Sequence, residues 1–156
     1  MKKNEEILEE SLKEIISLIK TTQEARTQII MPLMPMTKEK IINLSLHEKL
    51  LMDALVSRYS KIQDMLSNKI FMLFLKAVGE KIDGLTFIDV LNRLEKLHVL
   101  PSMYRWKDLR DLRNHLAHEY PDRPDLMAGF LNQAYEAIPE LIAIFETIDQ
   151  RLKALQ

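Results

Sequence analysis

Apolar residues recur at helical spacing along most of this chain. Between residues 125 and 155, for example, Leu141, Ile144, Ile148 and Leu152 fall three or four positions apart. An α-helix turns once about every 3.6 residues, so this spacing places the apolar side chains on one face of a helix. Similar stripes mark the other regular segments, and only three glycines occur in the whole chain. The sequence therefore predicts an all-α fold.

Short connections separate the predicted helices. The predicted helices cover residues 4–20, 38–77, 87–98, 102–117 and 125–155. The segment 21–37 breaks the pattern, because Pro32 and Pro35 prevent a regular helix. Its apolar residues are expected to cover the core or, alternatively, to make a dimer contact. The set predicts an up-and-down bundle of four to five helices, with residues 1–156 forming a single domain.

Local signals mark several of the expected helix ends. Thr37 and Ser102 each precede an apolar-periodic segment and are predicted N-caps. Thr86 and Asp89 resemble a capping box in which aspartate replaces the usual glutamate. His98 is expected at a helix C-terminus, where positive charge is favourable, and is interpreted as a structural residue.

The charge balance limits how the chain could bind nucleic acid. Its net charge is −1, so there is no overall attraction and an RNA contact needs a local basic patch. Candidates for that patch lie in the 102–117 helix: Arg105, Lys107, Arg110 and Arg113. Asp108 and Asp111 in the same helix partly offset them.

Composition also restricts the compartment and the cofactors. The chain has no cysteine, which excludes disulfides and thiolate metal sites and fits a reducing cytosol. The N-terminal residues lack the apolar segment of a signal peptide. The longest apolar run, residues 70–75, is too short to span a bilayer. A cytoplasmic protein without a membrane partner is expected.

Side chains that could take part in catalysis or binding are concentrated in residues 109–122, LRDLRNHLAHEYPD. Arg113 falls inside the apolar face of its helix, and a buried arginine must be paired or face a polar cleft. His118 would lie about 140° from Arg113 on one ideal helix. The two side chains can therefore converge only if the helix ends near Ala117 or if a second surface joins the site. Pro121 supports such an end, because the residue before a proline avoids the α conformation.

The pattern Arg113-Asn114-x-x-x-His118-x-Tyr120 resembles the signature of HEPN-domain proteins. Its four-residue spacer and its tyrosine two positions after the histidine resemble the HepT toxins, the partners of MntA-type minimal nucleotidyltransferase antitoxins. The resemblance implies an all-α fold like that of nucleotidyltransferase substrate-binding subunits, a homodimer and a metal-independent endoribonuclease without a cofactor. It also implies that the antitoxin modifies Tyr120 with AMP.

The chemistry implied for RNA cleavage follows from these residue types. His118 would activate the 2′-hydroxyl or protonate the leaving 5′-oxygen, because histidine titrates near neutral pH. Arg113 would stabilise the phosphorane-like transition state, and Asn114 would orient the phosphate or His118. A two-fold dimer would supply both a base and an acid. The substrate would be RNA, with tRNA as one candidate.

Further arginines are expected to contact RNA phosphates: Arg58, Arg105 and Arg110. For Arg58, in the run RYSKIQD, a snorkelling or ion-paired side chain is the alternative. His115 and His118 are three residues apart, but no third ligand accompanies them, so a metal site is not expected. His115 is interpreted as an exposed surface residue.

Other interpretations of the motif stay open. Arg113 could be an ion-paired arginine and His118 a histidine that simply ends a helix. The chain could be a non-catalytic binding module, a partner subunit that presents substrate to a nucleotidyltransferase. It could also be a purely structural helical dimer. An RNA cleavage assay distinguishes the ribonuclease from the binding module.

Overall fold

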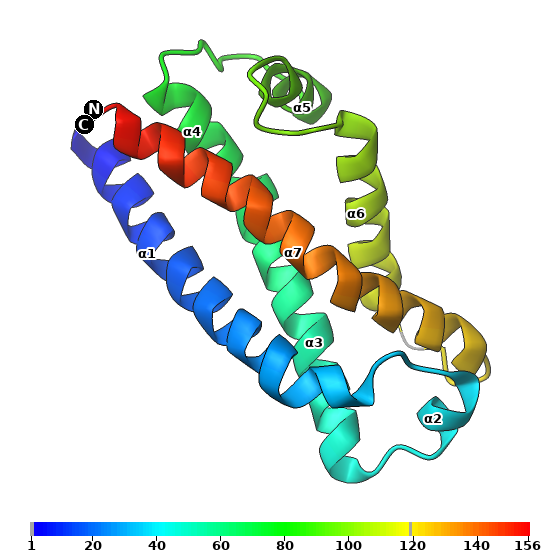
Figure 1. The fold of residues 1–156 in the computed structure, drawn as a ribbon. Helices are drawn as coiled ribbons and strands as arrows, with labels where there is room; N and C mark the ends of the chain where they lie inside the picture. The colour runs from blue at the N-terminus through cyan, green and yellow to red at the C-terminus, as the bar shows by residue number, and fades with distance from the viewer. Residues whose placement is uncertain (1, 119) are drawn as a thin grey trace.

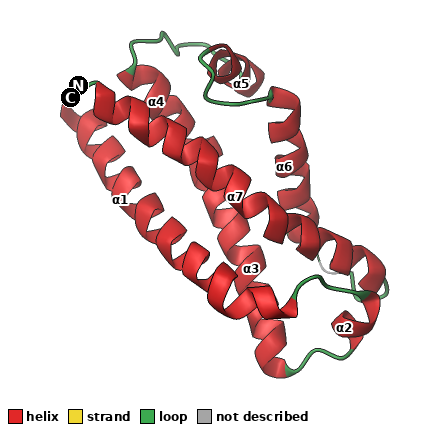
Figure 2. Ribbon diagram, viewed as in Figure 1, coloured by secondary structure: helices red, strands yellow, loops and turns green. Residues whose placement is uncertain are grey.

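The computed structural model describes residues 2–118 and 120–156, which are helical with connecting loops and no strand; Figure 2 shows this composition. Its α-helices are α1 (Lys2–Ala25), α2 (Lys38–Ile42), α3 (Leu46–Met65), α4 (Phe71–Ala77), α5 (Phe87–Lys96), α6 (Met103–Leu116) and α7 (Pro124–Ala154). Helices α1, α3, α4 and α7 run along the length of the molecule, with α5 and α6 beside them (Figure 1). The predicted all-α bundle is confirmed.

The first helix is longer than the sequence pattern predicted. It was expected over 4–20, but α1 runs to Ala25 and continues through a π-helical turn, Arg26–Ile30, and a 3₁₀ turn, Met31–Leu33. No proline occurs before Pro32, which sits at the start of the 3₁₀ turn, where its missing N–H is tolerated. The prolines therefore end the helix about ten residues later than predicted.

The region expected as one helix over 38–77 is divided. Thr37 caps α2 as predicted, accepting a hydrogen bond from the Lys40 N–H at 3.2 Å. A second start follows at Ser45, whose hydroxyl accepts from the Glu48 N–H at 3.1 Å while the Glu48 carboxylate accepts from the Ser45 N–H at 2.9 Å. This capping box begins α3 and leaves the five-residue α2 as a helix that the predicted four to five did not include.

A second π-helical turn, Leu66–Ile70, joins α3 to α4 and shifts the buried face. Leu55 and Ile62 before the turn, and Leu66 at its first position, are buried as the helical stripe predicted. After it the stripe would place Leu73 inside, yet Leu73 is only half-buried. Phe71, Phe74 and Leu75 are buried instead. The π turn takes up one extra residue, so the face that packs inward advances by one position.

The end of α5 also differs from the prediction. Thr86 and Asp89 form the predicted capping box, but α5 ends at Lys96 and His98 lies beyond it with a φ of 60°. The Arg151 side chain donates hydrogen bonds to the carbonyl oxygens of Leu97 and, at 3.3 Å, of His98. Arg151 in α7 therefore brings a positive charge to this C-terminus.

The core lies between α1, α3, α4, α6 and α7. Its largest fully buried side chains include Trp106, Tyr59, Phe71 and Phe74. The Phe71 and Trp106 rings are 4.8 Å apart in a tilted arrangement, so α4 packs directly on α6. Burying one such side chain stabilises a fold by roughly 1.5–3 kcal/mol. Among the described residues, no helix combines the length and hydropathy that a bilayer crossing requires.

Candidate functional site

Arg113 lies in the last turn of α6 and forms a bidentate ion pair with Asp64 of α3. Its Nε and Nη2 atoms each lie 2.9 Å from a carboxylate oxygen. The side chains are 29% and 38% exposed, so the pair sits at the edge of the core. The hydrogen bonds that Arg113 donates to Asp64 raise the pKa of Arg113 above its ordinary value.

The expected requirement for a partner of Arg113 is thereby confirmed, but the sequence did not identify that partner. In the sequence, Asp64 is only the last residue of the run RYSKIQD that begins at Arg58. The pairing joins residues 49 positions apart, so it depends on how α3 and α6 pack. The only available signal was a carboxylate on the side of α3 opposite its apolar stripe, a description that Asp53 shares.

A second contact holds α3 and α6 at this level. The buried Tyr59 hydroxyl donates to the Leu109 carbonyl oxygen at 2.6 Å, about one helical turn from the ion pair on each helix. Burial raises the pKa of Tyr59 well above its usual range, so the hydroxyl stays protonated and able to donate. The Arg113–Asp64 pair therefore rests on two helices that are fixed to each other.

His118 follows directly after the end of α6. The helix ends at Leu116, with Ala117 as its C-cap, as predicted. The Ala117 N–H donates to the Asn114 carbonyl at 3.3 Å and the His118 N–H to the His115 carbonyl at 3.2 Å, which tightens the last turn. The side chains of Asn114 and His118 are exposed. Within the described residues, no hydrogen bond links the Arg113 and His118 side chains.

His115 and Tyr120 form a cluster on Phe130 of α7. The His115 ring stacks on Phe130 at 4.7 Å with planes 8° apart, and the Tyr120 ring lies 5.5 Å from Phe130. The Tyr120 hydroxyl and the Nδ1 of His115 are 3.3 Å apart, and the tautomer decides which one donates. His115 is exposed as expected, but it is a packing partner of Tyr120. The sequence also predicts Glu119 on the last turn of the helix or just past it, and Glu119 lies outside the described residues.

The other basic candidates make contacts of their own or lie on other faces of their helices. Arg105 forms a bidentate pair with Glu140 at 2.8 and 2.7 Å, and the Arg110 guanidinium lies 4.7 Å from the Phe87 ring centroid. Arg58 is half-buried and lies about 120° around α3 from Asp64, by ideal helical geometry. Their predicted RNA contacts stay predictions.

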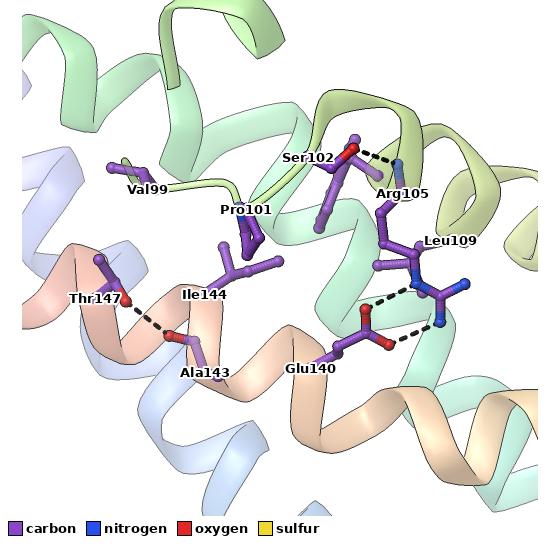
Figure 3. Close-up of a pocket in the computed structure, with 10 residues that line it drawn as sticks. Val99, Pro101, Ser102, Arg105, Leu109, Glu140, Ala143, Ile144 and Thr147 are labelled. Atoms are coloured by element: carbon purple, nitrogen blue, oxygen red, sulfur yellow. Dashed lines mark hydrogen bonds and ion pairs between the residues drawn. The ribbon is translucent and has the colours of Figure 1, made fainter. Parts of the chain in front are cut away.

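A small cavity of about 140 Å³ lies between α6, α7 and the segment before α6 (Figure 3). Its walls are mostly apolar, with the Arg105–Glu140 pair on one side. Figure 3 shows Pro101 and Ile144 facing each other across it. Trp106 also lines the cavity, and its buried indole N–H has no acceptor among the residues described. Of the described residues that line the cavity, only Arg105 and Glu140 are ionisable, and they are paired with each other.

Chemically, the end of α6 offers a fixed cation and an exposed imidazole. Asp64 occupies the Nε–Nη2 edge of Arg113, whereas the Nη1 donors point away from that carboxylate because the guanidinium is planar. Within residues 2–118 and 120–156, no group of three His, Asp or Glu side chains is arranged to hold a metal ion.

Comparisons of the chain with protein-family models, with curated proteins and with solved structures found no match.

Proposed function

We propose that this chain is a metal-independent endoribonuclease toxin of the HepT type, acting in the cytoplasm as a homodimer. The observation that carries the proposal is Arg113, which Asp64 holds in place, partly exposed, in the last turn of α6, five residues before the exposed His118. A guanidinium matches the geometry of phosphate, and an imidazole can exchange protons near neutral pH.

The proposed reaction uses the nucleophile that RNA itself carries. His118 removes the proton of a 2′-hydroxyl, whose oxygen attacks the adjacent phosphorus. The bond from phosphorus to the 5′-oxygen then breaks, and the histidine of the second protomer protonates that oxygen. The products are a 2′,3′-cyclic phosphate and a free 5′-hydroxyl. Arg113 stabilises the negative charge that develops on the phosphoryl oxygens, and Asn114 orients the phosphate.

The test is cleavage of total tRNA by purified protein in the presence of EDTA. The wild-type chain should yield products with 2′,3′-cyclic phosphate ends, and the His118→Ala variant should lose this activity by at least about a hundredfold, as expected for removal of an acid–base group. Undiminished cleavage by His118→Ala would contradict the assignment. The surface control is Lys69→Ala, which removes an exposed cation from the π-helical turn Leu66–Ile70.

Tyr120 is proposed as the residue that an MntA-like nucleotidyltransferase modifies with AMP. Its hydroxyl is held beside His115, so a bulky, charged group on that oxygen would stand next to the end of α6 and hinder RNA. Co-expression with an MntA-like nucleotidyltransferase should add the mass of AMP to the peptide that contains Tyr120. A Tyr120→Phe variant should remain unmodified.

The second candidate is a non-catalytic partner subunit of a nucleotidyltransferase. The observation that favours it is the neutralisation of the local basic residues, since Arg113 and Arg105 are both engaged by carboxylates. This candidate predicts no RNA cleavage by the wild-type chain, together with a stable complex with the nucleotidyltransferase in size-exclusion chromatography.

A further inference from the structure

Asp64 approaches Arg113 along one edge of the guanidinium only. Its two oxygens accept from Nε and from Nη2, both at 2.9 Å, which is the bidentate arrangement that fixes the plane as well as the position of an arginine. An arginine side chain alone has many rotamers, and a bidentate carboxylate selects among them. The Nη1 donors lie in the same plane and point away from the edge that Asp64 occupies.

The backbone that carries Asp64 is itself well anchored. The residues after it, Met65 and Leu66, are buried in the core. The residue before it, Gln63, is also buried and donates a hydrogen bond to the Ser67 hydroxyl at 3.2 Å, across the start of the π turn. An aspartate has a short side chain, so a fixed backbone leaves its carboxylate little freedom.

Stability alone explains this pair poorly. Ion pairs that are about one-third exposed contribute little to folding, because water screens them and ordering two side chains opposes them. The contact between α3 and α6 is in any case maintained by the buried Tyr59 hydroxyl on the Leu109 carbonyl. The Arg113–Asp64 geometry is therefore better explained by what it does to Arg113.

We infer that Asp64 is a positioning residue, which orients the Arg113 guanidinium so that its Nη1 edge meets the scissile phosphate of RNA. This inference rests on the proposed ribonuclease function. Asp64 does not touch the substrate; it acts through Arg113. A phosphate then binds a donor edge that is already oriented, so the contact forms without reorganisation as charge develops in the transition state.

A double-mutant cycle tests the inference, with kcat and KM measured on a short RNA for wild type, Asp64→Ala, Arg113→Ala and the double variant. Asp64→Ala should lower kcat by about ten- to a hundredfold and change KM by much less, since the orientation matters most in the transition state. Because Asp64 acts through Arg113, the double variant should be no slower than Arg113→Ala alone.

The matched control is Glu80→Ala. Glu80 pairs with Arg93 at 2.7 Å, and the two side chains are 32% and 37% exposed, close to the exposure of Asp64 and Arg113. Its loss should leave kcat within about twofold of wild type, as expected for an ion pair away from the site. Asp64→Asn and Asp64→Glu extend the series, and Asp64→Asn should keep part of the rate because one side-chain oxygen remains. All variants are compared only where circular dichroism and Tm show a folded chain.

The outcomes separate the two hypotheses. If wild type does not cleave RNA, or Arg113→Ala cleaves as wild type does, the proposed function fails and the inference fails with it. If Arg113→Ala is inactive while Asp64→Ala and Asp64→Asn keep the wild-type rate, only the inference fails. A higher rate in Asp64→Ala would show that the carboxylate inhibits by neutralising Arg113, and additive losses in the double variant would also overturn the inference.

Discussion

Asn132 of α7 binds the backbone of Met36 through both ends of its amide. The side-chain oxygen accepts from the Met36 N–H at 2.7 Å, and the side-chain nitrogen donates to the Met36 carbonyl at 2.9 Å. Met36 is 3% exposed, so both of its backbone groups lie where water cannot readily replace the amide. The loop after the 3₁₀ turn is thereby held on α7 without a regular element of its own.

The Asn132→Ala variant should lose about 2–3 kcal/mol of unfolding free energy, because it leaves two poorly hydrated backbone groups without partners. Urea denaturation followed by circular dichroism measures the change. Gln133→Ala, at the next and exposed position of α7, is the control and should shift the unfolding free energy by less than about 0.5 kcal/mol. Equal effects of both variants would show that the Asn132–Met36 hydrogen bonds do not contribute to the unfolding free energy.

The Arg105–Glu140 pair should give a small stability contribution that depends on pH. Hydrogen bonds from Arg105 lower the pKa of Glu140 below its ordinary value of 4.5. A carboxyl whose pKa is lower in the folded state stabilises the fold above its unfolded pKa and loses this contribution as pH falls through the folded value. Because the Glu140 side chain is 41% exposed, screening limits the effect to roughly 0.5 kcal/mol.

Glu140→Gln should therefore be less stable than wild type at pH 7 by about 0.5 kcal/mol, and the difference should shrink as pH falls below 4.5. Parallel urea titrations at pH 7 and at acidic pH provide the two numbers. A difference that grows on acidification would contradict the pairing.

At the scale of residues, the sequence identified the ionised groups better than their partners. Arg113 was recognised because a charge on an apolar face needs compensation, and Ser102 because its position before an apolar stripe is that of an N-cap. Asp64, Phe130 and Glu140 were missed as partners. Each lies ten or more residues from the groups that it contacts, so only the packed helices bring them together.

At the scale of elements, end signals decided which predictions succeeded. The Thr37, Thr86 and Ser102 caps were predicted and are present, because each precedes a clear apolar stripe. Ser45 and Glu48 form an equally good capping box, but they lie between apolar residues that continue the helical period on both sides. Periodicity alone therefore predicted one helix where two caps produce two.

Ser45→Ala should lower the unfolding free energy by about 1 kcal/mol, since it removes the acceptor for an N–H at the start of α3. Ser57→Ala is the control within the same helix: Ser57 is exposed in its middle, and alanine is the better helix former there, so stability should be unchanged or slightly higher. Thermal unfolding of the two variants beside wild type would show the contrast.

At the scale of the whole molecule, the proposed cleavage needs two histidines and hence two chains. Mixing wild type with His118→Ala under conditions that allow subunit exchange should therefore lower activity more steeply than dilution does. With an equal mixture, only about one dimer in four keeps both histidines if the subunits combine at random, so about a quarter of the rate should remain. A remaining rate near one half would mean that each chain works alone.

The whole fold was the most predictable level and the site the least. Helical periodicity, few glycines and short connections suffice for a bundle, because every helix must bury its own apolar stripe. The placement of His118 depended on where α6 ends, and Pro121 indicated that end correctly. Whether Arg58, Arg105 and Arg110 share a surface with Arg113 depends on helix rotation and packing, which the pattern of one helix does not contain.

The π turn Leu66–Ile70 has a consequence for how this chain should be compared with others. A π turn contains one residue more than an α turn over the same length of helix axis. A protein with the same fold but with an unbroken α-helix here would be one residue shorter, and its alignment with this chain would need a gap inside a helix, where gaps are normally forbidden. Forcing the two into register without that gap would rotate every later position of the helix by about 100° and pair core residues such as Phe74 with surface residues.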